Sequence, residues 1–241
     1  MKRIGVLIPP ANARCETEYP SVLPQGFTAH FTRLVRPEAT LTEASLIAMK
    51  ESALDAADRL SWIQPVALAY ACTSGSFLGG SDARDAIANQ LHERTGVPAV
   101  TTASAVVGAL KALSVRKAGV ITPYPPAITA GAIELLSVNG VSVAEVSSYG
   151  YELSRDILAI SPESVAARVR TMVARCPELD GVFISCTNVG TFTVIEDLEQ
   201  ELGIPVLSSN SATLNAVLRL AGYEGSIAGI GKIGQSSTSV A

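Results

Sequence analysis

The 241-residue chain is poor in charge and has no long hydrophobic run. Charged residues make up 17% of it and the formal net charge is −4, which predicts no basic surface for nucleic acid. No 18-residue apolar stretch occurs, so no membrane span is expected. The basic start at Lys2 and Arg3 leads into an apolar run that stops at Pro9, too short for a secretory signal. We therefore expect a cytoplasmic protein that binds neither nucleic acid nor a membrane.

Histidine and cysteine are also scarce. The two histidines, His30 and His92, are expected within a strand and late in a helix, which disfavours a hydrolase built on a nucleophile and a histidine. The four cysteines, at positions 15, 72, 176 and 186, have spacings that fit no zinc motif. No metal site is therefore predicted.

Apolar residues are plentiful, at 48% of the chain, and can bury a substantial core. Short β-branched runs alternate with segments in which apolar residues recur three and four apart, a pattern typical of repeated β-α units and a parallel sheet. We predict an α/β fold with strands at residues 4–8, 29–34, 66–70, 99–101, 118–122, 142–146, 181–185 and 206–208. Helices are predicted at residues 43–60, 82–94, 104–113, 162–174, 194–202 and 211–220.

Three segments of the first half recur in the second half, in the same order. The similar pairs are residues 3–9 and 117–123, 71–74 and 185–188, and 96–104 and 203–211. Ordered repeats of this kind indicate an internal duplication. We predict two pseudo-symmetric halves, residues 1–113 and 114–241, each a four-stranded parallel sheet flanked by helices. The C-terminal helix could pack back on the first half.

Cys72 and Cys186 occupy matching places in the two copies. Each follows a predicted buried strand and begins a stretch of helix-capping residue types. Ligands of such sheets bind beyond the carboxyl ends of the strands, so both thiols are expected to face one cleft between the halves. An ordinary thiol is only about 3% thiolate at pH 7, and we expect a position at a helix start to lower the pKa of each.

Polar neighbours of the two cysteines could hold a carboxylate. They are Thr73, Ser74, Thr187 and Asn188. Gly79 and Gly80 are expected to let a loop bend over the cleft. Arg14 could pair with a carboxylate, but Glu16 and Glu18 beside it favour a solvated charge. Two thiols facing one substrate suit racemisation and cis-trans isomerisation equally at this point, because one can act as base or nucleophile and the other as acid.

The chain resembles the aspartate/glutamate racemase superfamily, and within it the branch of maleate cis-trans isomerases and arylmalonate decarboxylases. The resemblance is carried by Glu16, Glu18 and residues 9–12, 72–75, 122–124 and 186–188. It implies a duplicated α/β enzyme that uses no metal or organic cofactor. It also implies a small unsaturated dicarboxylate as substrate, with Cys72 adding to the double bond and Cys186 supplying the proton.

The resemblance assigns carboxylate-binding roles to Asn12 and Tyr124. Arylmalonate decarboxylases have glycine at the first cysteine position, so Cys72 argues against simple decarboxylation. A further substrate-binding asparagine of maleate isomerases has no counterpart around residues 153–155, which leaves the identity of the carboxylate open. A two-cysteine racemase, an arylmalonate-type decarboxylase and a non-catalytic carboxylate-binding protein remain alternatives. Assembly into a homo-oligomer is also left open.

Overall fold

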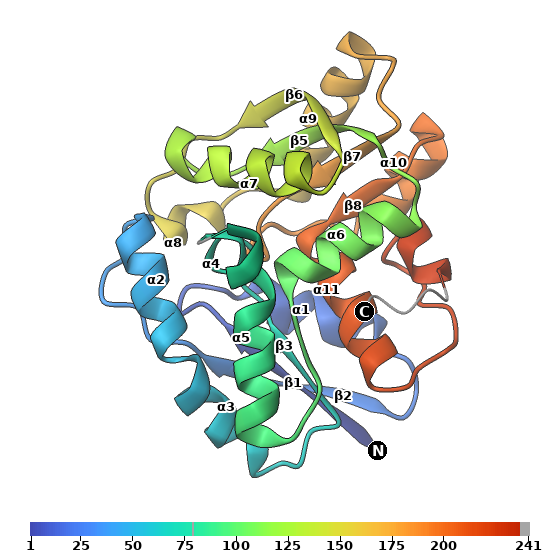
Figure 1. Cartoon of the computed structure of the whole chain (residues 1–241). Coiled ribbons are helices and arrows are strands. Elements are labelled where there is room, and N and C mark those ends of the chain that lie inside the picture. The colour runs from blue at the N-terminus through green and yellow to red at the C-terminus, as the bar shows by residue number, and fades with distance from the viewer. Residues whose placement is uncertain (79, 237–241) are drawn as a thin grey trace.

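Two four-stranded parallel sheets, each flanked by helices, organise the chain (Figure 1). The computed structural model describes residues 1–78 and 80–236, without the side chains of residues 80–84. The first sheet has the order β2-β1-β3-β4 and comprises β1 (Lys2–Ile8), β2 (Phe27–Arg33), β3 (Ala67–Tyr70) and β4 (Ala99–Thr101). The second has the order β6-β5-β7-β8 and comprises β5 (Lys117–Thr122), β6 (Ser142–Ser148), β7 (Gly181–Ile184) and β8 (Val206–Ser208).

The two sheets share one topology. In each half the first strand lies between the second and the third, and the fourth strand pairs with the third. The third strands, β3 and β7, consist entirely of buried residues, as expected of strands covered on both faces. The predicted α/β fold with two pseudo-symmetric halves is confirmed. Cys72 and Cys186 come two residues after these equivalent strands.

Five predicted helices start and end within two residues of their predicted limits. They are α5 (Gly80–Thr95), α6 (Thr102–Ala112), α9 (Pro162–Arg175), α10 (Ile195–Leu202) and α11 (Ser209–Leu220). The continuous helix predicted at residues 43–60 is wrong, because the chain forms α2 (Glu43–Glu51) and α3 (Ala53–Ser61). The Ser52 hydroxyl donates to the Met49 carbonyl (2.8 Å) and accepts from the Val35 N–H (2.9 Å), so its side chain competes with the helix at the break.

Four helices have no counterpart among the predicted ranges, although a helix start was expected at Cys72: α1 (Arg14–Val22), α4 (Thr73–Phe77), α7 (Pro126–Val138) and α8 (Ser154–Ile157). Proline begins α7, where its missing N–H does no harm. Gly79 and Gly80 were predicted to let a loop bend over the cleft; Gly79 lies outside the described residues, and Gly80 is the first residue of α5. Across residues 1–78 and 80–236, no helix combines the length and the apolar character needed to cross a membrane.

The helices α6 and α11 connect the two halves. They lie side by side between the sheets, and α11 also contacts β3 and β4 of the first sheet (Figure 1). In return, α6 contacts β8 and α7 of the second half. Ser208 caps α11 in a reciprocal arrangement with Ser211, which fixes the start of α11.

Candidate active site

A cavity lies beyond the carboxyl ends of six strands, in loops from both halves. All eight residues predicted for the site line it: Asn12, Cys72, Thr73, Ser74, Tyr124, Cys186, Thr187 and Asn188. Seven further residues, not predicted from the sequence, complete the lining: Pro9, Ala11, Arg36, Leu41, Leu46, Ser154 and Ile157. The centre of a water molecule can move through a volume of about 30 Å³ in this cavity.

One wall of the cavity is a seam between loops of the two halves. Thr40 and Leu153 form an isolated antiparallel bridge. The Leu41 N–H donates to the Glu152 carbonyl (2.8 Å), which holds the two loops together beside that bridge. Each loop follows an edge strand, β2 in the first half and β6 in the second. The two halves therefore share the enclosure of the cavity.

Cys72 begins a helix, as predicted, although α4 has only five residues. Its Sγ accepts a hydrogen bond from the Gly75 N–H (3.3 Å). A Cβ on Gly75 would lie 3.0 Å from that sulfur and 2.9 Å from the Tyr70 hydroxyl oxygen, so glycine is needed for this close approach. The Cys72 side chain is thus packed tightly against the first turn of α4.

Cys186 does not begin a helix, and that expectation is wrong. The chain continues in turns, and the next helix, α10, starts only at Ile195. Cys186 has φ of 100°, a conformation that residues with a Cβ rarely adopt. Its N–H donates to Ser209 Oγ (3.0 Å), and its Sγ accepts from the Asn188 N–H (3.4 Å). Strained backbone of this kind is concentrated at functional sites.

Burial raises the pKa of both thiols. The expectation from the sequence, that the pKa of each thiol would be lowered, is therefore wrong. For Cys186, burial outweighs the Asn188 N–H and the Tyr124 hydroxyl and raises the pKa to about 12. For Cys72, burial again dominates the rise in pKa, against the Gly75 N–H, the Ser74 hydroxyl and the positive charges of Arg36 and Lys50. One short helical turn is too weak to offset the loss of water. Both thiols are protonated at neutral pH, and Cys72 is the one with cations nearby.

Hydrogen bonds join the two cysteine loops to each other. Ser209 Oγ accepts from the Thr73 hydroxyl (2.9 Å) as well as from the Cys186 N–H. The Thr187 hydroxyl donates to the Ala71 carbonyl (3.0 Å) and accepts from Asn12 Nδ2 (3.0 Å). The two loops are therefore positioned relative to one another by neutral hydrogen bonds.

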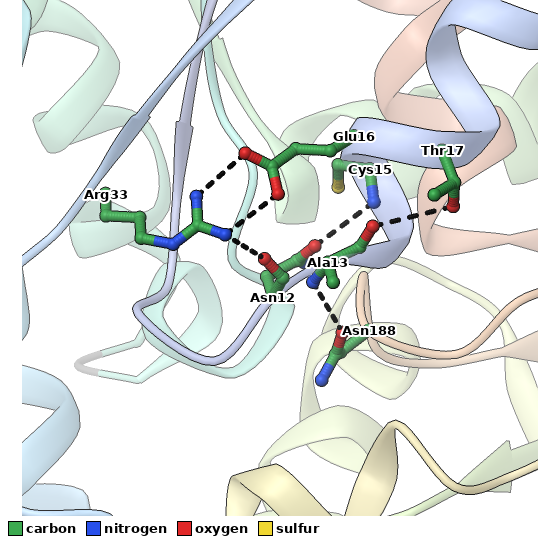
Figure 2. Close-up of polar contacts among 7 residues, drawn as sticks. All are labelled: Asn12, Ala13, Cys15, Glu16, Thr17, Arg33 and Asn188. Carbon is green, nitrogen blue, oxygen red and sulfur yellow. Dashed lines mark hydrogen bonds and ion pairs between the residues drawn. The ribbon is translucent and has the colours of Figure 1, made fainter.

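The loop after β1 is held on both sides (Figure 2). Arg33 donates to the Asn12 carbonyl (3.3 Å) and to both carboxylate oxygens of Glu16 (2.8 Å each). From the second half, Asn188 Oδ1 accepts from the Ala13 N–H (3.1 Å). The Asn12 side chain spans the halves, since its Oδ1 accepts from the Cys15 N–H (3.1 Å) while its Nδ2 donates to Thr187. One hydrogen of the Asn12 amide is left for a ligand.

Tyr124 presents a buried hydroxyl close to the Cys186 thiol, and no described residue forms a hydrogen bond of good geometry with it. Burial raises the pKa of Tyr124 well above its ordinary value, with the neighbouring Cys186 acting in the same direction, so the hydroxyl stays a donor. Arg14 is not part of the cavity lining, and its guanidinium donates to the Leu158 carbonyl (3.0 Å). Within the described part of the chain, no three His, Cys, Asp or Glu side chains gather to hold a metal ion.

Known proteins share this sequence and this fold. The family model of arylmalonate decarboxylase matches residues 4–234. A maleate isomerase of Nocardia farcinica is 28% identical, with 100% of this chain and 98% of the relative aligned. An arylmalonate decarboxylase of Bordetella bronchiseptica is 27% identical, over 91% of this chain and 90% of the relative.

One solved structure shares the fold closely. It is a cysteine-to-serine mutant of the Nocardia farcinica maleate cis-trans isomerase with a covalently bound succinylcysteine intermediate. Its TM-score is 0.89 at 24% identity, covering 97% of this chain and 98% of that chain. The match of the family model extends over nearly the whole sequence, from β1 to the last turn after α11. The chain belongs to the arylmalonate decarboxylase family, in the branch of the aspartate/glutamate racemase superfamily that includes the maleate isomerases.

Proposed function

We propose that this chain is a cofactor-independent cis-trans isomerase that converts a small unsaturated dicarboxylate of the maleate type into its trans isomer. The observation that carries the proposal is the placement of Cys72 and Cys186 in one cavity, on equivalent loops of the two halves. Similarity to maleate isomerases supports it, as does the succinylcysteine found in the structural relative. We place the reaction in the cytoplasm.

The chemistry divides between the two thiols. The Cys72 thiol first gives up its proton to solvent water. The resulting thiolate adds to one alkene carbon, and the electron pair of the double bond moves to the other carbon, which takes the proton of the Cys186 thiol. The resulting succinyl thioether has a single bond between the two carbons, about which it rotates. The Cys186 thiolate then removes a proton from the same carbon. The double bond re-forms in the trans geometry and Cys72 leaves as thiolate.

The polar lining of the cavity provides donors for the substrate's carboxylate. Tyr124 contributes an unpartnered hydroxyl and Asn12 the free hydrogen of its amide. Thr73, Ser74, Thr187 and Asn188 also line the cavity beside the cysteines, where the hydroxyls of Thr73 and Thr187 already donate to Ser209 Oγ and the Ala71 carbonyl. Hydrogen bonds to a charged acceptor are the stronger ones, especially in a site with little water. These groups would therefore hold the carboxylate beside the attacked carbon.

Proton NMR of maleate incubated with the purified chain tests the proposal. We expect fumarate to appear, and we expect Cys72→Ser and Cys186→Ser each to lower kcat by at least about a thousandfold, because a hydroxyl is almost never ionised at pH 7. Cys176→Ser is the matched control, since Cys176 lies outside the cavity and bonds to Glu145. Absence of fumarate, or near-full activity of Cys72→Ser, would refute the isomerase assignment.

A decarboxylase is the second candidate, because the family model that matches is that of arylmalonate decarboxylase. That reaction would use Cys186 alone. Release of CO2 from an arylmalonate by the Cys72→Ser variant would favour it over isomerisation. A racemase would instead exchange the proton next to the carboxylate in deuterated water, and the same NMR experiment with aspartate or glutamate detects that exchange.

A further inference from the structure

Arg36 is a charged residue in the cavity wall that the proposed reaction does not use. It follows β2, is half-buried and lines the same cavity as both thiols. Apolar side chains lie around it in the lining, from Leu41, Leu46 and Ile157. A buried cation is costly unless an anion compensates it.

The structure gives Arg36 only neutral partners. Its Nε donates to the Glu38 carbonyl (2.7 Å), and its Nη2 donates to the Ala39 carbonyl (2.9 Å) and to Ser154 Oγ. No described carboxylate forms an ion pair with it. Arg33, three residues earlier, differs sharply, since both carboxylate oxygens of Glu16 neutralise it.

These contacts fix the guanidinium without an ion pair, although the charge of the nearby Glu38 acts on it. The two carbonyls lie in the loop of Arg36 itself, and Ser154 belongs to the other half of the chain. The Nη1 group donates to no described residue, so its hydrogens are available to a ligand in the cavity. A rigidly held donor in a cavity lining recognises an anion at low entropic cost.

We propose that Arg36 binds the second carboxylate of a dicarboxylate ligand and thereby selects dicarboxylates over monocarboxylates. The inference deepens the proposed function and rests on it for the position of the first carboxylate, near Tyr124 and Asn12. Lys50 is the other cation near Cys72, but its Nζ donates to the Leu78 carbonyl (2.8 Å) and it is absent from the cavity lining. Arg36 is therefore the cation that contacts the ligand.

Succinate and butyrate provide the test, because both have four carbons and neither has a double bond to react. Isothermal titration of the full chain should show that succinate binds more tightly than butyrate. In Arg36→Gln, the dissociation constant for succinate should rise about 10- to 100-fold, the range expected for a charge-assisted contact. The constant for butyrate should change less than about threefold. Arg36→Lys should recover part of the succinate affinity, because lysine restores the positive charge but lacks the planar guanidinium that can donate two hydrogen bonds to a carboxylate.

Two control variants distinguish direct contact between Arg36 and the ligand from a general effect of positive charge. Lys50→Met removes the nearby cation outside the cavity, and Arg94→Gln removes a surface cation paired with Asp58. Neither should change the ratio of succinate to butyrate affinity by more than about threefold. The proposal is overturned if Arg36→Gln weakens both ligands equally, if Lys50→Met has the same effect as Arg36→Gln, or if the unmodified chain binds the two ligands equally.

The binding assay is independent of turnover. A chain that makes no fumarate but loses succinate selectivity in Arg36→Gln retains the Arg36 assignment and loses the isomerase. If the unmodified chain makes fumarate but Arg36→Gln binds succinate normally, the isomerase assignment is retained and the Arg36 assignment is lost. If Arg36→Gln does not fold, the succinate-to-butyrate ratio of Arg36→Lys decides, since an unchanged ratio would overturn the role of the guanidinium.

Discussion

At the scale of single residues, the backbone of Cys186 predicts an unusual stability effect. With φ of 100°, a Cβ at this position is strained and glycine is not. We expect Cys186→Gly to be more stable than Cys186→Ala by about 1 kcal/mol, although both variants lack the thiol. Urea unfolding of the two variants measures the difference. Equal midpoints, or a more stable alanine variant, would show that the turn carries no strain.

The raised pKa of Cys186 predicts how stability changes in alkali. The thiol stays neutral in the folded chain up to about pH 12, whereas the unfolded chain loses this proton near pH 9. The stabilisation is therefore complete below about pH 9 and is lost as the pH rises toward 12. Between pH 9 and 10 the unmodified chain should lose about 1 kcal/mol more than Cys186→Ala in urea unfolding. Equal losses of unfolding free energy in the two proteins would contradict the raised pKa of Cys186.

Alkylation should distinguish the two thiols. Arg36 and Lys50 act to lower the pKa of Cys72, and no cation acts on Cys186. Iodoacetamide should therefore label Cys72 faster than Cys186, at rates that rise about tenfold per pH unit between pH 7 and 9. Peptide mass spectrometry follows both sites, and succinate should protect Cys72. Faster labelling of Cys186 would reverse the proposed roles of nucleophile and acid.

The residues that were missed have a physical explanation. The eight predicted residues follow the first and third strands of each half, where sequence motifs recur. Arg36 and Ser154 instead follow the edge strands β2 and β6. Which side chain of such a loop points inward depends on contacts with the other half, such as the bridge between Thr40 and Leu153. One general signal was available in the sequence. The carboxyl ends of all parallel strands lie at the same edge of a sheet, so the loops after the edge strands could also have been expected near the site.

At the scale of elements, apolar spacing predicted the positions of most helices but not the break at Ser52 or the turn after Cys186. Spacing reports which face of a helix is buried. It does not report hydrogen bonds from distant backbone, such as the one from the Val35 N–H to Ser52. The turn after Cys186 is similarly held by Glu18, whose carboxylate accepts from the N–H groups of Thr191 (2.5 Å) and Phe192 (2.9 Å).

Glu18 gives a prediction at this scale, because it connects α1 to that turn and also accepts from Asn210 Nδ2 (2.5 Å). Glu18→Gln keeps one acceptor oxygen for the two backbone N–H groups but replaces the other with an NH2 group that faces the Asn210 amide donor, and should cost about 2 kcal/mol of stability. Glu16→Gln on the same helix is the control. It removes an exposed ion pair with Arg33 and should cost less than about 1 kcal/mol. Similar losses in the two variants would argue against a special role for Glu18.

At the scale of the whole molecule, the two halves are expected to unfold together. We propose the division at residues 1–113 and 114–241 as a description of the duplication, not as two independent folding units. The helices α6 and α11 each contact the other half, and Asn12 bonds to Thr187 across the division. Calorimetry should show one transition whose calorimetric and van't Hoff enthalpies agree. Two resolved transitions would mean that each half is stable alone.

The seam between the two halves has a kinetic consequence. The loops at Thr40 and Leu153 are joined across the two halves, so a ligand that enters beside them would have to part them. The apparent affinity for substrate is the intrinsic affinity reduced by the fraction of molecules that are open. We expect loop motion of this kind, on the microsecond-to-millisecond scale, to set an upper limit on turnover, however fast the thiol chemistry is.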